Sequence, residues 1–523
     1  MKKRGHKLQI LLALAFSSEL LYVIIASYAD LRFHIPIYLL CYGGIFLFYW
    51  IAAVAFFDMQ PHRLVGKLEQ QIKKYPRISR SKWLNNYFIR QKIATKLTSK
   101  EVLTIGIFFG VIFRLTLLIT TPSLSDDIYR YVWDGKVALN GINPYLYPPN
   151  DEALSSLRDD EIYPKVNHPE ISTIYPPMSQ IVFLVLARIK PTVMGFKTAI
   201  LLLDLLTAWV LFLIIKRLSL NWNRMLLYFW NPLVIVEFSG NGHADVFGIL
   251  LLAAALYFVV RGRTLWANFY LVLSFLTKFI SVILLPIFAL LKNEFKSMVL
   301  FLFVILAAAF YLPYSDAGER LVTGLVVYSA KWQFNASIFT VILAAVKAWL
   351  PQEWIVKWMI TPYGYGVDPA TIDSRGTDLA LMISKVFILL IFSGIFIYFL
   401  ARFKRDFKRE GNIWVFKFGL ISFGAFFLLN PTAQPWYLCW LLPFLVVAPN
   451  RAGFLLTGLV GISYWTLNDF TRTGVWQESN WVQLVEYLPF YLLLIFDYVM
   501  SKLKPRMSSL REKQMFKSKP GNA

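Results

Sequence analysis

The chain has little of what most soluble enzymes use for chemistry. Of its 523 residues only two are cysteine and five are histidine, and charged residues make up 16%. Both cysteines, Cys41 and Cys439, lie in apolar runs, which gives neither a disulfide framework nor metal-ligand spacing. The sequence also lacks a Walker loop, a dinucleotide fingerprint, an HExxH motif and a serine elbow. We therefore expect no cofactor and no metal.

Acidic residues are few, 31 against 53 lysines and arginines, for a net charge of +22. Such a charge can indicate nucleic-acid binding, but the basic residues stand in blocks between apolar runs: at the N-terminus, in 58–100, in 402–409 and after Met500. Basic blocks of this kind mark the cytoplasmic side of a membrane protein and attract anionic lipid headgroups. We expect membrane lipid as a partner and no nucleic acid.

Hydrophobic residues make up 57% of the chain and aromatic residues 17%. A helix needs about 20 apolar residues to cross a bilayer, so the composition predicts an all-α polytopic membrane protein with about 13–14 spans. The probable spans lie near 8–28, 36–57, 101–121, 196–215, 225–239, 245–261, 265–279, 280–291, 297–313, 379–401, 413–429, 436–449, 452–468 and 482–500. The first has a basic start without a small-residue cleavage site, which indicates an uncleaved helix.

Three regions and two interfacial helices are expected. Residues 1–100 hold two extra helices and a basic cytoplasmic loop, 101–500 the membrane-embedded catalytic part, and 501–523 a basic tail. Two shorter apolar segments, 174–189 and 337–350, are expected to lie as amphipathic helices at the outer interface.

The stretch from Ser125 to Gly135 carries three carboxylates and a guanidinium directly after an apolar span. Two adjacent carboxylates make sense as an acid/base pair, because like charges held close raise one pKa and leave the other group ionised. We take Asp126 as the general base and Asp127 as the group that tunes it. Arg130 stands four residues from Asp126, so the two would share a face of a helix. A solvated loop with ordinary charges is the alternative.

Other polar residues break the apolar pattern. Asp204 lies in the middle of a span, where a buried, hydrogen-bonded helix-packing role is preferred to a functional one. Lys278 is expected at the outer end of its span, where it would suit a phosphate or simply extend to the interface. The turn 239–245 contains Asn241, His243 and Asp245 on the side of Asp126, although a tight polar hairpin would look similar.

The order of these motifs resembles the GT-C glycosyltransferases. The closest resemblance is to the polyprenyl-phosphate-mannose-dependent mannosyltransferases, over residues 100–440. The motifs are Asp126-Asp127 with Asp134, Asn143-Pro144-Tyr145, Tyr175-Pro176-Pro177, Asp204-Leu205-Leu206-Thr207-Ala208, Asn231-Pro232-Leu233, Gly240-Asn241-Gly242-His243-Ala244-Asp245, Lys278 and Phe334-Asn335-Ala336-Ser337. The family's acidic motif is often Asp-x-Asp, whereas here the two aspartates are adjacent, which leaves open which one is the base.

The resemblance implies a GT-C-type bundle in the cell (inner) membrane with its active site on the extracytoplasmic side. It implies transfer of a hexose, mannose by preference, from a polyprenyl-phosphate sugar to a hydroxyl of a glycan or glycolipid acceptor, with inversion. Catalysis would fall to Asp126 and Asp127. Binding of the donor phosphate or sugar would fall to Arg130, Asn241, His243, Asp245 and Lys278, and acceptor binding or loop positioning to Asp134, Tyr145, Tyr175, Asn335 and Gln434.

The main alternative function is a secondary transporter or a lipid-linked sugar flippase. Such proteins usually have two related halves and broken helices at the membrane midplane. The sequence shows no internal repeat, and its candidate functional charges gather at the predicted outer side rather than at mid-membrane. An enzyme is therefore the preferred interpretation.

Overall fold

The computed structural model describes residues 2–59, 99–351, 354 and 369–517. Within these ranges the regular structure is helical, apart from one parallel bridge between Phe334 and Thr432. The α-helices are α1 (Lys2–Ala26), α2 (Ile35–Ala55), α6 (Ser99–Leu118), α7 (Asp127–Leu139), α8 (Pro177–Ile189), α9 (Val193–Arg217), α10 (Leu226–Phe229), α11 (Pro232–Val234), α12 (Asp245–Val260), α13 (Thr264–Phe275), α14 (Leu285–Leu291), α15 (Lys296–Tyr311), α16 (Arg320–Lys331), α17 (Ile338–Trp349), α19 (Pro369–Ala401), α20 (Phe403–Glu410), α21 (Asn412–Leu429), α22 (Leu442–Val447), α23 (Arg451–Leu459), α24 (Trp465–Thr473) and α25 (Asn480–Lys517).

Short helices of other types connect these elements. They are the 3-10 helices η1 (Leu31–His34), η3 (Glu152–Leu157), η4 (Tyr163–Lys165), η5 (Trp222–Met225), η7 (Phe279–Leu284), η8 (Asn293–Phe295), η9 (Leu312–Ala317), η10 (Pro435–Leu441) and η11 (Val460–Tyr464), and the π-helix η6 (Ile235–Gly240).

Eight helical segments in the described part of the chain are long and apolar enough to cross a membrane; they include α1, α2, α6, α9, α15, α19, α21 and α25. The predicted all-α polytopic membrane protein is thereby confirmed. Shorter apolar helices, among them α12, α13 and η10–α22, occupy other predicted spans. The count of about 13–14 spans and the interfacial placement of α8 and α17 stay predictions, because length and composition do not decide them.

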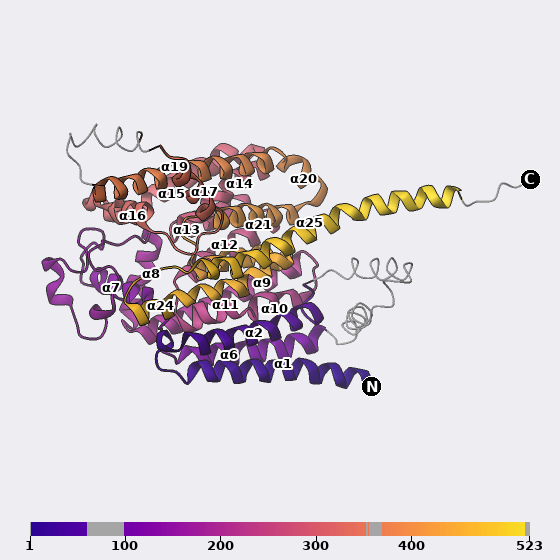
Figure 1. Cartoon of the computed structure of the whole chain (residues 1–523), viewed down its shortest axis with the longest axis horizontal. Coiled ribbons are helices and arrows are strands. Elements are labelled where there is room, and N and C mark those ends of the chain that lie inside the picture. Colours follow the sequence, from indigo (N-terminus) through magenta and orange to yellow (C-terminus); the bar gives the residue numbers. More distant parts are fainter. Residues whose placement is uncertain (1, 60–98, 352–353, 355–368, 518–523) are drawn as a thin grey trace, which may run out of the picture.

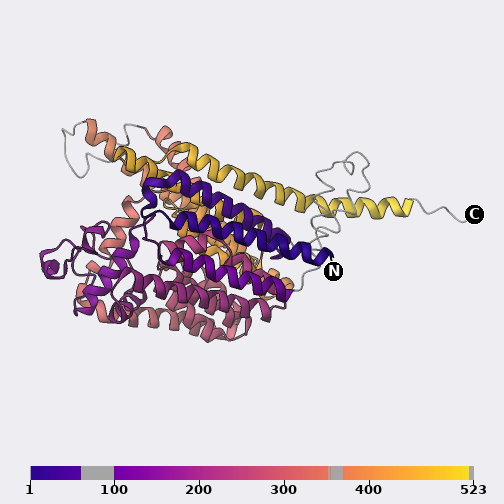
Figure 2. The same ribbon diagram turned by 90° about the horizontal axis from the view of Figure 1, so that it is seen from below.

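The long helices run roughly along one axis, so the bundle has two distinct ends (Figures 1 and 2). The start of α1, the basic helix α20 and the C-terminal part of α25 lie at one end, and α7 with the loop that follows it lies at the other. The predicted topology places the acidic loop 122–173 and the basic blocks on opposite sides of the membrane, and it stays a prediction. Residues 60–98 of the predicted basic loop fall outside the described ranges.

The N-terminal hairpin of α1 and α2 packs into the same core as the rest of the bundle. From α2, the Tyr42 hydroxyl donates to the Thr457 carbonyl at 2.9 Å and the Tyr49 hydroxyl to the Leu227 carbonyl at 2.7 Å. Where the hairpin turns, the Leu31 N–H donates to Ser123 Oγ at 3.0 Å. The last of these bonds holds the α1–α2 connection, in which Arg32 lies, against the segment that leads to Asp126.

Asp204 has the packing role that the sequence favoured. Its carboxylate accepts from Arg114 Nε at 2.5 Å and from the Tyr228 hydroxyl at 2.6 Å, and the carboxylate and the guanidinium are fully buried. Ionisable groups at membrane depth are costly unless paired, and this pair joins α9 to α6 and α10.

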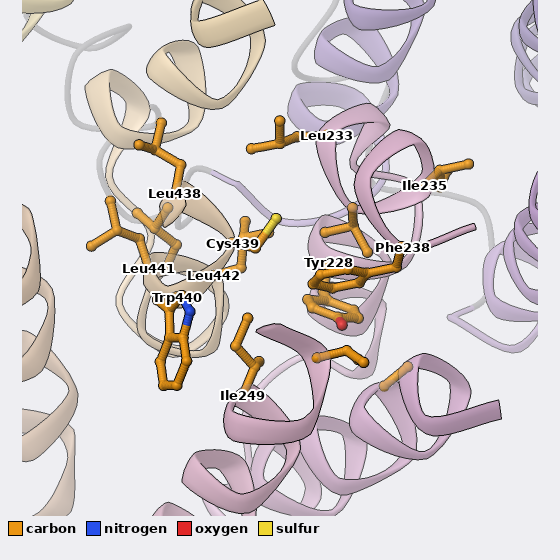
Figure 3. Packing of buried hydrophobic residues seen from close by; sticks show 14 of the residues in the cluster. Tyr228, Leu233, Ile235, Phe238, Ile249, Leu438, Cys439, Trp440, Leu441 and Leu442 are labelled. Atoms are coloured by element: carbon orange, nitrogen blue, oxygen red, sulfur yellow. The ribbon is translucent and has the colours of Figure 1, made fainter. Parts of the chain in front are cut away.

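Near the end of the bundle that carries α7, η10 and the start of α22 pack against the broken helical segment α10–η6. Figure 3 shows the facing side chains, which are Tyr228, Leu233, Ile235 and Phe238 on one side, Leu438, Cys439, Trp440, Leu441 and Leu442 on the other, and Ile249 of α12 beneath them. Gly242 follows η6 with a φ of +74°, a left-handed conformation that favours glycine. The packed core and this turn together hold the 241–245 segment at the end of the bundle.

Candidate active site

A single cavity of about 730 Å³ brings together most of the predicted site residues. Asp126, Asp127, Arg130, Tyr175, Asp245, Lys278 and Gln434 all line it. Its aromatic wall comes from α16, η10 and the segments beside them, and consists of Tyr328, Trp332, Phe334, Trp436, Tyr437, Trp440 and Trp476. The cavity therefore has one wall that carries acidic, basic and other polar side chains and another wall that is aromatic.

Asp127 is the first residue of α7, and its side chain lines the cavity. Its carboxylate accepts from Asn167 Nδ2 at 2.8 Å and from the Tyr131 hydroxyl at 3.4 Å, and one-fifth of the side chain is exposed. Burial raises the pKa of Asp127 to about 6, although the Asn167 hydrogen bond and the positive charge of Lys278 favour the ionised form. A carboxyl with a pKa this close to neutrality suits proton transfer at physiological pH.

Asp126, one residue earlier, has a more open setting. Its side chain is 41% exposed and lies 3.7 Å from an Arg32 nitrogen, and it makes no capping bond to α7. Burial raises its pKa, and Arg32 partly offsets the effect. Asp126 precedes the regular turns of α7, and Arg130 forms its ion pair with Asp134 rather than with Asp126.

Arg130 forms an i,i+4 ion pair with Asp134, with Nε and Oδ1 2.8 Å apart and both side chains buried. Gln180 of α8 donates to the other oxygen of Asp134 at 3.1 Å and to the Thr173 hydroxyl at 2.8 Å. This network ties α7 to α8 and to the segment before it. Asp134 thus stabilises the wall of the cavity through its bonds to Arg130 and Gln180. Arg130 itself lines the cavity.

Lys278 stands where α13 ends, with its backbone extended before η7 begins. Its ammonium donates to Asp245 Oδ1 at 2.6 Å and lies 3.7 Å from the centre of the Tyr437 ring. Trp440 Nε1 donates to the same aspartate oxygen at 2.7 Å. The side chain of Lys278 is one-third exposed, so the ammonium faces the cavity as part of an ion pair rather than as an isolated interfacial cation.

Asn241 and His243 lie behind the cavity wall. The His243 ring is 1% exposed and stacks on Trp436, with ring centres 3.8 Å apart. Burial, together with the positive charge of Lys278, lowers the pKa of His243 well below its usual range, so a neutral imidazole faces Asp127. Asn241 donates to a buried carboxylate, Glu237, at 3.0 Å. Neither of these two predicted donor-binding residues lines the cavity itself.

The predicted positioning residues shape the loops around the cavity. The Tyr145 hydroxyl donates to the Tyr175 carbonyl at 2.7 Å, which joins two parts of the segment between α7 and α8. Asn335 has a φ of +49° and donates through its amide to Glu486 at 3.0 Å. It directly follows Phe334, whose backbone pairs with residues 431–433 just before Gln434.

Several site residues were not predicted from the sequence. Arg32 lines the cavity from a hairpin distant in sequence, and Asn167 lines it from an irregular loop. Glu237 lies in a segment whose apolar sequence predicts an ordinary span. The run Gln434-Pro435-Trp436-Tyr437 in an apolar region is the local signal that could have pointed to the aromatic wall. Within the described residues, no three His, Cys, Asp or Glu side chains form a group that could hold a metal ion.

Comparison with known proteins gives consistent matches. Residues 85–294 match the family model described as alpha-(1->6)-mannopyranosyltransferase, N-terminal domain, and residues 372–496 match the model described as MptB C-terminal domain. Alpha-(1->6)-mannopyranosyltransferase A of Mycobacterium tuberculosis (strain ATCC 25618 / H37Rv) is 23% identical over 396 residues, which cover 71% of this chain and 70% of the relative. No solved structure gives a significant match.

Proposed function

Because this chain is a GT-C-like mannosyltransferase, we propose that it transfers mannose from polyprenyl-phosphate mannose to a hydroxyl of a glycan or glycolipid on the extracytoplasmic face. The observation that carries the proposal is one cavity lined by both a carboxyl with a raised pKa, Asp127, and a cation, Lys278. A base and a cation facing the same space are what displacement of a phosphate by a hydroxyl requires.

Asp127 acts as the general base in this proposal. It takes the proton of the acceptor hydroxyl while that oxygen attacks the anomeric carbon of mannose from the side opposite the phosphate, which inverts the configuration. Asp127 is favoured over Asp126 because donors from two other residues, Asn167 and Tyr131, orient its carboxylate. Asp126 lies beside Arg32 in the more exposed part of the cavity. We assign it to binding or orienting the acceptor.

Lys278 stabilises the leaving group. As the bond between the anomeric carbon and the phosphate oxygen breaks, its electron pair goes to polyprenyl phosphate, and a fixed cation there lowers the barrier. Asp245 and the Tyr437 ring hold the ammonium in place. Arg130, which also lines the cavity, is the second candidate for a contact with the phosphate. A monophosphate donor carries less charge than a diphosphate, so the proposed site requires no metal.

The aromatic wall suits the sugars. Ligand pockets commonly combine aromatic surface with a few placed polar groups, and a hexose ring has apolar faces that pack on such surfaces. Trp436 and Tyr437 stand next to Gln434, which offers an amide to sugar hydroxyls. We place mannose of the donor between this wall and Asp127, with the acceptor entering past Asp126.

The test supplies membranes containing the full chain with radiolabelled polyprenyl-phosphate mannose and a mixed glycolipid fraction as acceptor. We expect label in the glycan fraction only when the protein is present, and an anomeric configuration opposite to that of the donor. Label that crosses sealed vesicles as intact donor, without transfer, would instead identify a flippase.

A further inference from the structure

The turn between α1 and α2 brings a cation into the cavity from a part of the chain that precedes the matched family models. Arg32 of η1 lines the cavity, and it lies well before residue 85, where the first matched model begins. This turn lies at the end of the bundle that carries α7 (Figure 1). The contacts of Arg32 at this end indicate its role.

The Arg32 guanidinium is held in one orientation by Asp30. Its Nε donates to both Asp30 oxygens at 3.1 Å, and its Nη2 donates to Asp30 Oδ2 at 2.8 Å. Asp30 also caps η1, because its carboxylate accepts from the Arg32 backbone N–H at 2.9 Å. The buried bond from the Leu31 N–H to Ser123 Oγ fixes the turn beside the cavity. One edge of the guanidinium is thus committed to Asp30, which leaves Nη1 for a second partner.

Asp126 lies on the Nη1 side of the guanidinium. Arg32 Nη1 and Asp126 Oδ1 are 3.7 Å apart, which is beyond hydrogen-bond length, and the two side chains are 39% and 41% exposed. A hydroxyl has one donor and two acceptor lone pairs. A hydroxyl beside this pair can therefore accept from Arg32 and donate to Asp126.

The charge of this group differs from that of the proposed phosphate site. Two carboxylates, Asp30 and Asp126, share one guanidinium, so the group is negative when both are ionised. Although partial burial opposes the effect, hydrogen bonds from Arg32 lower the pKa of Asp30 below its ordinary value. A negative group disfavours a phosphate or carboxylate on a ligand, because like charges repel. Arg32 is therefore suited to neutral hydroxyls rather than to the donor phosphate.

The charges around the two adjacent aspartates distinguish two parts of the cavity. Among the cations, Lys278 acts on Asp127, whereas Arg32 and Lys165 act on Asp126. The helix α24, which packs against η1, lines the same cavity with Thr466, Leu467 and Phe470. The side of the cavity at Arg32 is thus separate from the side at Lys278, and the proposed base, Asp127, adjoins both.

We propose that Arg32 and Asp126 together bind a hydroxyl of the acceptor, other than the one that attacks, on the neutral sugar that receives mannose. This inference rests on the proposed function, and it makes the N-terminal hairpin part of the acceptor site. Asp30 is a positioning residue that acts through Arg32. When the pair holds a neighbouring hydroxyl, the attacking hydroxyl is directed to Asp127, the next residue of the chain.

The first test measures mannose transfer by the full chain in membranes, with polyprenyl-phosphate mannose as donor and the glycolipid fraction as acceptor. Arg32→Gln removes the charge and shortens the side chain. A hydrogen bond to a charged group typically contributes about tenfold or more in affinity, so the acceptor KM should rise about tenfold. The donor KM and the turnover at saturating acceptor should change little, because the donor phosphate is placed at Lys278.

The matched control is Arg188→Gln. Arg188 is exposed in the last turn of α8 and does not line the cavity. We expect this variant to keep the wild-type KM for both substrates.

Acceptor analogues decide whether Arg32 contacts the sugar directly. The probes are a neutral alkyl mannoside and its monodeoxy forms, each lacking one hydroxyl and each measured as a competitor of the glycolipid acceptor. Against the wild type, removal of the recognised hydroxyl should weaken competition about tenfold. Against Arg32→Gln the same removal should cost much less, because groups in direct contact are not additive. Asp126→Asn should lose the same penalty for the same hydroxyl.

A merely structural role for Arg32 predicts different results. An unchanged acceptor KM in Arg32→Gln, a donor KM that rises as much as the acceptor KM, or equal deletion penalties in wild type and variant would each overturn the inference. So would an alkyl mannoside that does not compete with the wild-type acceptor. Inorganic phosphate is the probe for an anion site: if it competes with the acceptor in the wild type and not in Arg32→Gln, the ligand of Arg32 is a phosphate and the inference is wrong.

A second variant covers the case in which Arg32→Gln fails to accumulate. Arg32→Lys keeps the charge but lacks the planar fork that reaches two partners at once. It should still raise the acceptor KM and reduce the same deletion penalty, and wild-type values would contradict the inference. A wild-type protein that transfers no mannose would refute the proposed function, which is a different outcome from any of these.

Discussion

At the scale of single residues, the ammonium of Lys278 is held by one carboxylate and one aromatic ring at the edge of the cavity. Lys278→Met keeps the apolar stem and removes the charge. Loss of one group that stabilises developing charge typically costs about 10²–10³ in turnover, so transfer should fall by that order. The effect would appear in KM instead if Lys278 binds ground-state phosphate.

The control for this substitution is Lys385→Met. Lys385 donates to the carbonyls of Ser329 and Ala330 at 2.8 Å and does not line the cavity. Transfer kinetics of both variants, measured with polyprenyl-phosphate mannose, check the prediction. Equal, small effects of the two substitutions would mean that Lys278 has no part in the reaction.

The raised pKa of Asp127 predicts the pH dependence of transfer. As a base Asp127 must be ionised, so turnover should be level above a pH of about 6 and fall about tenfold per pH unit below it. Lys278→Met removes a charge that favours the ionised form, so the acidic limb of its residual activity should move to higher pH. An acidic limb near the ordinary pKa of an exposed aspartate would argue against Asp127.

At the scale of elements, the contact between α7 and α8 sets the position of Asp127. Gly135 of α7 lies so close to α8 that an added Cβ would stand 2.5 Å from the Phe183 carbonyl oxygen. Gly135→Ala should therefore push the helices apart, with an overpacking cost of about 1–3 kcal/mol and reduced transfer. Gly43 of α2 has no atom within 4 Å of its added Cβ, so Gly43→Ala should change neither thermal unfolding nor transfer.

The elements were partly predictable. Apolar length was enough to predict α1, α2, α6, α9 and the other long helices. It did not predict the broken segment around η6. A run of apolar residues predicts one continuous span, although Asn231 and Pro232 interrupt the helix there. The packing of the N-terminal hairpin beside Asp126 depends on long-range contacts of Tyr42, Tyr49 and Leu31, which leave no local pattern.

At the scale of the whole molecule, the two ends of the bundle should lie on opposite sides of the membrane (Figure 1). Single cysteines at Asp160, exposed in the loop after α7, and at Lys408, exposed on α20, report the two ends. The background variant lacks the buried Cys41 and Cys439. A membrane-impermeant reagent applied outside intact cells should label position 160 and not position 408, and labelling of both from one side would refute the topology.

The motif order was enough to predict which residues gather at one end of the bundle, and most of those predicted line one cavity. The choice between neighbours was not predictable. Asp126 and Asp127 are adjacent, yet one precedes α7 beside Arg32 and the other begins the helix beside Asn167. Which of them meets Arg32 and which meets Asn167 depends on a hairpin and a loop that are distant in sequence.

The central claim is that Asp127 is the base, and the most direct measurement compares mannose transfer by purified Asp127→Asn and Asp126→Asn. Asparagine keeps shape and removes basicity, so Asp127→Asn should lose about 10²–10⁴ in turnover while still binding donor. Asp126→Asn should lose much less. If Asp126→Asn is the inactive variant and Asp127→Asn is not, the base is Asp126 and the account of Asp127 is contradicted.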